Sequence, residues 1–256
     1  MLLETIMTFA DHLFVIVLAV VHPIVGYVSF KRLVRRIEAG EIIDRTKLYL
    51  TTITGHWFLF ALALALWISQ ERSWSALGFG LRTDTWFMVG AALTVAGVVL
   101  LLVQIRQMAA TDTDEVRSLR GRIGKLEIII PRNGNELGRF YGLSLTAGIV
   151  EETLWRGFII WYFSQFLPLW AAVLISTIGF GLAHAYQGIG NLPRVTLVGA
   201  AFAGLYVLTG SLWLPMVLHA AVDILQGRLA YDVIRRCDSE APAGDNNGDA
   251  IAFNAS

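Results

Sequence analysis

The stretch Leu48–Ile68, LYLTTITGHWFLFALALALWI, decides the fold class, because it contains no Asp, Glu, Lys or Arg over its whole length. A helix needs roughly 20 mostly apolar residues to cross the hydrocarbon of a bilayer. A strand of a membrane β-barrel would alternate polar and apolar residues, and the run LFALALALWI within this stretch does not. An open sheet in lipid would leave backbone groups unpaired, so the stretch is predicted to be a membrane-spanning helix.

The composition of the whole chain also indicates a membrane protein. Of its 256 residues, 55% are hydrophobic and 16% are charged, and the mean hydropathy is +0.60. An ordinary soluble domain has about 25% charged residues. The single Cys237 excludes a disulfide scaffold. The 20 basic and 20 acidic residues lack the basic excess typical of nucleic-acid binders, so we expect a lipid bilayer and no nucleic acid as partner.

Six further apolar stretches are candidate spans. They are Leu13–Phe30, Trp86–Ile105, Phe140–Phe166, Leu167–Ala185, Val195–Thr209 and Leu212–Ala230. The predicted fold is therefore all-α, a polytopic transmembrane helical bundle of about seven spans, with eight possible.

The basic residues predict how the bundle sits in the membrane. Seventeen of the twenty Lys and Arg lie on one side when seven spans are counted. Arg72 and Arg82 fall on the other side, and Arg156 falls inside a span. The positive-inside rule then places the N-terminus outside and the C-terminus in the cytoplasm, across the inner membrane if the chain is bacterial.

The long basic connection after the third span carries a helical pattern of its own. Apolar residues recur there at three- and four-residue steps, namely Val116, Leu119, Ile123, Leu126 and Ile130. Arg and Lys fill positions between them, which predicts a cytoplasmic interfacial helix that lies on the membrane surface. A partly ordered basic loop is the alternative.

Six chemically active side chains lie inside the predicted spans. They are Glu151, Glu152, Arg156, His184, His219 and Asp223. An ionisable side chain within a span is costly unless it is paired or wet, so each is a functional candidate. A single histidine in a span more often forms a hydrogen bond between packed helices. His22 and His56 are assigned to such packing and His12 to the interface, without a role in a site.

Helical geometry pairs four of these residues. Positions four apart lie on one face of a helix, one turn along it. Glu152 and Arg156 can therefore form a buried ion pair, either within a site or as a structural clamp. His219 and Asp223 likewise share a face. Glu151 has no cation partner on its own helix, and a carboxylate in a dry site without a partner suits a general base.

Three short motifs in this region resemble those of a known family. EETLWRG at 151–157 looks like the EExxxR motif of the CPBP family, the CAAX-protease and bacteriocin-processing (Abi) intramembrane endopeptidases. FGLAH at 180–184 is similar to its FxxxH motif, and HAAVD at 219–223 matches its HxxxN/D motif. Three such motifs in order, on three apolar helices, are specific. The resemblance covers about residues 141–230.

The resemblance implies that Glu151 and His184 hold and activate a water that attacks a peptide carbonyl. Glu152 and Arg156 would brace their helix. The family has been described both as metalloproteases and as glutamate proteases, so Zn²⁺ is a possible cofactor, held by Glu151, His184 and His219 if the enzyme depends on metal. The chain has no HExxH motif, and water activation without a cofactor is favoured.

The third motif departs from the pattern of the prenyl-protein endopeptidases, which have Asn where this chain has Asp223. The resemblance implies that His219 and Asp223 stabilise the oxyanion or complete the site. An ionised Asp cannot donate a hydrogen bond to an oxyanion. Asp223 is therefore expected either to stay protonated or to orient His219.

The sequence thus predicts an intramembrane endopeptidase, similar to CAAX prenyl protease 2, that acts on a membrane-associated protein or peptide. Residues 1–139 would hold three spans and the basic loop, 140–237 the CPBP-like catalytic core, and 238–256 a disordered polar tail. Two alternatives stay open. One is a non-catalytic scaffold or bacteriocin-immunity protein of the same fold, and the other is a proton-coupled transporter.

Overall fold

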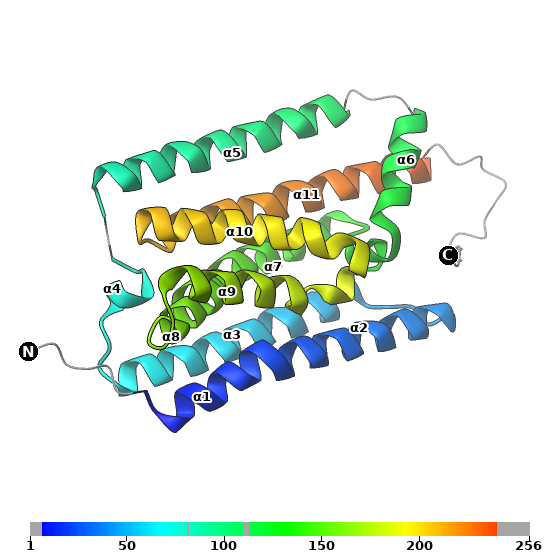
Figure 1. The fold of residues 1–256 in the computed structure, drawn as a ribbon. Helices are drawn as coiled ribbons and strands as arrows, with labels where there is room; N and C mark the ends of the chain where they lie inside the picture. Colours follow the sequence, from blue (N-terminus) through cyan, green and yellow to red (C-terminus); the bar gives the residue numbers. More distant parts are fainter. Residues whose placement is uncertain (1–6, 81, 110–112, 240–256) are drawn as a thin grey trace, which may run out of the picture.

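The computed structural model describes residues 7–80, 82–109 and 113–239, which form helices and no strands. The α-helices are α1 (Phe9–Ile16), α2 (His22–Glu38), α3 (Arg45–Ser69), α4 (Trp74–Leu77), α5 (Thr85–Ala109), α6 (Thr113–Ile123), α7 (Gly134–Glu152), α8 (Ile160–Phe163), α9 (Leu169–Ala183), α10 (Leu192–Thr209) and α11 (Trp213–Ser239). The π-helices η1 (Val17–Val21) and η3 (Thr153–Ile159) join α1 to α2 and α7 to α8. The 3₁₀ helices are η2 (Gly124–Ile129), η4 (Ala185–Gln187) and η5 (Ile189–Asn191). The long helices lie side by side as a bundle (Figure 1), which confirms the all-α prediction.

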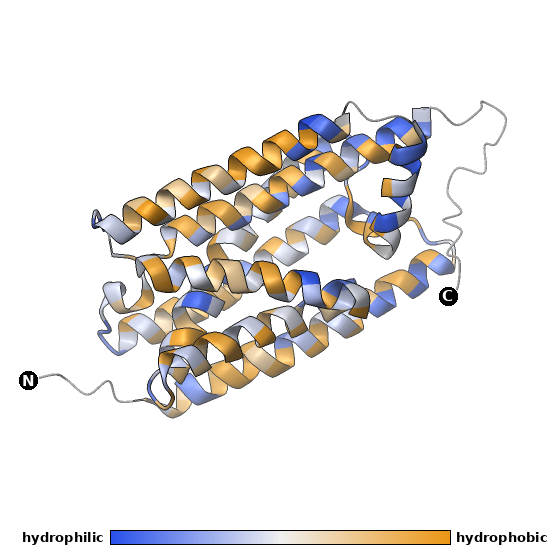
Figure 2. Cartoon of the chain, turned by 45° about the horizontal axis from the view of Figure 1, so that its top comes forward, coloured by the Kyte–Doolittle hydropathy of each residue, from blue (hydrophilic) through white to orange (hydrophobic). Residues whose placement is uncertain are grey.

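Among the described residues, four helical stretches are long and apolar enough to cross a membrane, namely Phe9–Glu38, Arg45–Ser69, Thr85–Met108 and Ile189–Thr209. The other three predicted spans are also helical, but α9 has only 15 residues, and α7 and α11 carry charged side chains. Apolar residues cover the middle of the bundle, and hydrophilic residues gather at the end where α6 lies (Figure 2). The chain is a helical membrane protein, and the count of seven spans stays a prediction.

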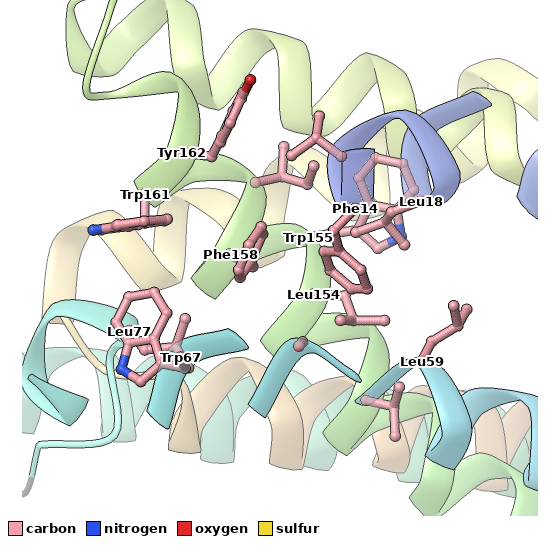
Figure 3. Close-up of a cluster of buried hydrophobic side chains, with 14 of the residues drawn as sticks. Phe14, Leu18, Leu59, Trp67, Leu77, Leu154, Trp155, Phe158, Trp161 and Tyr162 are labelled. Atoms are coloured by element: carbon pink, nitrogen blue, oxygen red, sulfur yellow. The ribbon is translucent and has the colours of Figure 1, made fainter. Parts of the chain in front are cut away.

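The largest buried cluster packs the N-terminal helices against η3 and α8 (Figure 3). The ring of Phe14 on α1 lies edge-on to that of Phe158, with centroids 5.0 Å apart. The ring of Trp67 on α3 meets that of Trp161 in the same way at 4.7 Å. Such aromatic pairs stabilise packing beyond the apolar area that they bury. The cluster therefore fixes the segment that follows Glu152 against α1 and α3.

A buried ion pair locks α1 to the residues after α3. Arg72 donates two hydrogen bonds to Asp11, of 2.7 and 2.6 Å, and the two side chains are 4% and 0% exposed. The guanidinium of Arg72 also lies over the ring of Trp161, 4.4 Å from its centroid. Asp11 and Arg72 are far apart in the sequence, and for that reason no spacing along one helix predicted this pair.

The basic connection folds into a helix whose apolar face is partly buried. Gly124, whose φ is +54°, ends α6, and η2 continues the chain. Val116 is 1% exposed, and Ile123 packs against the cluster that contains Tyr231 of α11. Part of the apolar face of this helix thus packs against protein, and its place at the membrane surface stays a prediction. Because α11 continues to Ser239, beyond the predicted end of the last span, it offers that protein surface.

Charged residues clamp this end of the bundle. Arg120 and Arg132 donate to the same oxygen of Glu127, at 2.8 and 2.6 Å, and both also contact Asp238 of α11. Burial raises the pKa of Glu127, but the hydrogen bonds and charges of the two arginines outweigh it, and the pKa lies below its usual value. Asp238 thus belongs to α11, while positions 240–256 of the predicted tail lie outside the described residues.

Helices α7 and α11 approach each other closely at Gly148. A Cβ there would lie 2.8 Å from the carbonyl oxygen of Met216 and 2.9 Å from the Cβ of Ala220. We expect Gly148→Ala to push the helices apart and to lower the free energy of unfolding by about 1–3 kcal/mol. Gly142→Ala on the same helix adds a Cβ with nothing within 4 Å and should not destabilise. Thermal unfolding in detergent measures both, and equal midpoints would contradict the prediction.

Candidate active site

Side-chain contacts join the six predicted residues in two neighbouring groups, Glu151 with His184, and Glu152 with Arg156, His219 and Asp223. Glu151 and Glu152 end α7, Arg156 lies in η3, His184 follows α9, and His219 and Asp223 lie in α11. The π-helix η3 begins directly after Glu152, and such local widening of a helix is frequent at functional sites.

Glu152 and Arg156 form the predicted buried ion pair, and both side chains are 0% exposed. Arg156 donates through Nη1 to Glu152 Oε1 at 2.9 Å and through Nη2 to the carbonyl oxygen of Gly199 in α10, also at 2.9 Å. His219 Nδ1 lies 2.7 Å from the same oxygen of Glu152. Glu152, rather than Asp223, therefore orients His219, and the pair ties α7, α10 and α11 together.

Phe180, the first residue of the second motif, forms an apolar wall inside the site. The guanidinium of Arg156 lies 4.1 Å from the centroid of its ring, a distance typical of cation–π contact. The ring centroids of Phe180 and His184 are 4.5 Å apart, and the ring of His219 meets Phe180 edge-on at 6.0 Å. Phe180 thus touches all three polar groups, which accounts for an aromatic residue at this position.

The two oxygens of Glu151 have different surroundings. Oε1 lies 3.0 Å from Nε2 of His56 in α3. Oε2 has no hydrogen-bond partner among the described residues and lies 3.6 Å from Nε2 of His184, which is too long for a direct hydrogen bond. His184 Nδ1 donates to the carbonyl oxygen of Phe180 at 2.8 Å, so the ring is held with Nε2 toward Glu151. Glu151 and His184 are 15% and 16% exposed.

Asp223 lies next to His219, on the more exposed side of the site. Its Oδ2 lies 3.7 Å from Nε2 of His219, and its side chain is 38% exposed, more than that of any other of the six residues. The nitrogen of His219 that is not bound to Glu152 therefore faces the accessible side of the site, together with a carboxyl group.

The histidines have one property of metal ligands but not their spacing. His56, His184 and His219 each have Nδ1 bonded to an oxygen, as the second ring nitrogen of a metal-binding histidine does. Within 7–80, 82–109 and 113–239, however, no group of three His, Cys, Asp or Glu is spaced to hold a metal ion. The arrangement does not fit a metal ion, and no step below passes through one.

His56 is the site residue that the sequence analysis missed. It was assigned to helix packing, because it belongs to none of the three motifs. The signal that could have found it is a histidine in the middle of the uncharged stretch Leu48–Ile68. Its partner Glu151 lies on another helix, and spacing along one helix does not show such a pair.

Comparison with known proteins adds one finding. Residues 133–225 match the family described as Type II CAAX prenyl endopeptidase Rce1-like. The matched segment contains all six predicted residues and leaves His56 outside. No curated protein and no solved structure matches the chain. The match confirms the resemblance carried by the three motifs, and residues 133–225 of this membrane protein are similar to the CAAX-type proteases of the CPBP family.

Proposed function

We propose that the chain is an intramembrane endopeptidase that hydrolyses a peptide bond of a membrane-associated protein or peptide, with a water activated by Glu151 and His184. The observation that carries the proposal is the separation of 3.6 Å between Glu151 Oε2 and His184 Nε2. A water that lies beside this pair, at hydrogen-bond distance from each atom, can bond to both. Glu151 Oε2 is buried and otherwise without a partner, a state that a bound water relieves.

The reaction follows from these positions. Glu151 Oε2 takes a proton from the water while the water oxygen bonds to the carbonyl carbon of the substrate. The tetrahedral intermediate then collapses, the C–N bond breaks, and the proton passes from Glu151 to the leaving amine. One water is consumed, and a carboxylic acid and an amine are released. His184 holds the water in line with the carbonyl.

His219 and Asp223 are assigned to the developing oxyanion. His219 Nδ1 is engaged by Glu152, so Nε2 donates to an oxyanion only when the ring carries both hydrogens. A protonated Asp223 would supply a second donor from the same side. Glu152 and Arg156 act through His219, because they fix the plane and direction of its ring.

The charge distribution supports a site that is reached from the cytoplasm. Under the positive-inside rule the N-terminus lies outside, and the end of the bundle that carries α6 lies in the cytoplasm. The chain after α9 returns through η4 and η5 directly after His184, which supports a site near this end. The proposed substrates are therefore segments that enter from the cytoplasmic half of the membrane.

Two quenched fluorescent peptides test the proposal on the purified protein in lipid vesicles. One carries a farnesylated C-terminal CAAX sequence, and the other has the same sequence without the prenyl group. We expect cleavage by the unaltered protein and a loss of about 10²–10³-fold in His184→Ala. Natural substrates are sought in a second assay. It compares the peptide termini found in membranes of cells that produce the unaltered protein with those of cells that produce His184→Ala. Unchanged cleavage by His184→Ala, or no cleavage specific to the unaltered protein in either assay, would overturn the proposal.

A chelator tests the cofactor-free mechanism. Because no step uses a metal, 1,10-phenanthroline should leave kcat/KM unchanged, and elemental analysis of active protein should find no stoichiometric metal. Loss of cleavage on chelation, restored by added Zn²⁺, would show that a metal activates the water instead.

A further inference from the structure

His56 lies outside the segment that matches the family, yet it contacts Glu151 directly. It belongs to α3, which packs along α7, and its side chain is 14% exposed. Its Nε2 is 3.0 Å from Glu151 Oε1. The N-terminal part of the chain therefore supplies a hydrogen-bonding group to the carboxylate at which the proposed reaction begins.

The orientation of this ring is determined by its second nitrogen. His56 Nδ1 lies 2.9 Å from the carbonyl oxygen of Thr52, one helical turn earlier. Because a carbonyl oxygen only accepts, Nδ1 carries a hydrogen, and the ring is held with Nε2 toward Glu151. Nε2 donates to the Glu151 carboxylate when the ring carries both hydrogens. His184 is anchored in the same manner, to the carbonyl oxygen of Phe180. Two rings that are fixed in the same way thus approach Glu151, one at each oxygen.

A third ring limits the movement of His56. His22 on α2 lies edge-on to it, with ring centroids 6.2 Å apart. A carboxylate on a free side chain exchanges its two oxygens by rotation about its last bond. With one oxygen bonded to His56, rotation of the carboxylate plane breaks that hydrogen bond, so the other oxygen stays on the side of His184.

We propose that His56 is a positioning residue, which holds Glu151 Oε1 so that Oε2 faces His184 and the attacking water. This inference rests on the proposed proteolytic function. It assigns the two oxygens of Glu151 separate tasks, one for orientation and the other for proton transfer. It also extends the site to α3, a helix outside the family-matched residues 133–225.

Three variants separate positioning from packing. His56→Phe keeps an aromatic ring but removes the hydrogen bond, whereas His56→Gln keeps a donor at a similar reach. Trp57→Phe is the control, because it removes a different hydrogen bond between the same two helices, from Trp57 Nε1 to Thr146 Oγ1 at 3.2 Å. Each variant is compared with the unaltered protein for kcat, KM and thermal unfolding midpoint, with the two quenched peptides in vesicles.

We expect His56→Phe to lower kcat by about 10–100-fold with little change in KM, as a displaced catalytic group does. Its unfolding midpoint should fall no further than that of Trp57→Phe, and His56→Gln should recover most of the lost kcat. Equal kcat values for His56→Phe and Trp57→Phe, or for His56→Phe and His56→Gln, would overturn the inference alone. No cleavage by the unaltered protein would instead overturn the proposed function, and the positioning role with it.

Discussion

Glu151→Gln is expected to lower kcat for peptide cleavage by about 10³–10⁴-fold and to leave the protein folded. The amide has the shape of the carboxylate and can still bond to His56 through one of its atoms. It cannot accept a proton from water, so the first step of the reaction is lost. Cleavage of the quenched peptides measures kcat, and the thermal unfolding midpoint reports folding.

Glu38→Gln is the matched control, because Glu38 is exposed in the last turn of α2. It should cleave like the unaltered protein. Normal cleavage by Glu151→Gln would refute the general-base assignment. Cleavage in detergent, where no ion gradient can exist, also separates the protease from a proton-coupled transporter, and its loss in Glu151→Gln separates it from a non-catalytic scaffold.

Arg156→Met is expected to destabilise the protein by about 3–5 kcal/mol, because it leaves a buried carboxylate without its cation. Glu152 and Arg156 are both 0% exposed, so water cannot replace the lost partner without a change in packing. The variant also removes the donor to the carbonyl oxygen of Gly199. Glu152, which holds His219, loses its arginine partner. Denaturant titration in detergent measures the stability, and cleavage should be lost in the protein that remains folded.

The double variant Glu152→Leu, Arg156→Met tests the cause of this effect. Removal of both charges leaves no unpaired ion, so the double variant should be destabilised by less than the sum of the two single variants. Arg228→Met is the control, because Arg228 and Asp232 form an exposed pair with the same spacing on α11. We expect that substitution to change stability by less than about 1 kcal/mol. A similar loss in Arg156→Met and Arg228→Met would contradict a buried, energetically coupled pair.

Spacing along one helix predicted the contacts that stay within one helix. Glu152 and Arg156 are four residues apart, and they form the ion pair that helical geometry requires. The contacts of Glu152 with His219 and of Glu151 with His56 join different helices. Such pairs depend on how α3, α7 and α11 are rotated about their axes, and residue spacing does not contain that information.

The lengths of α9 and α11 were also not predicted correctly from the sequence. Hydropathy placed the fifth span up to Ala185, whereas α9 ends at Ala183 after 15 residues. His184 directly follows the end of α9, and its Nε2 lies 3.6 Å from Glu151 Oε2. By contrast, α11 is longer than predicted. It continues beyond Ala230 to Ser239 through a polar stretch, where low hydropathy predicts the end of a span. Tertiary contacts with α6, not composition, keep this stretch helical.

The position of His219 on the last long helix has a consequence for biosynthesis. When α7 leaves the ribosome, the partners of Glu152 in α10 and α11 have not yet been made. A lone charged residue at the centre of a helix costs about 2.5–3.5 kcal/mol on insertion, and the predicted span Phe140–Phe166 carries three. We therefore expect α7 to wait at the insertion machinery and to enter the bilayer together with α10 and α11. The proposed site is then complete only after that moment.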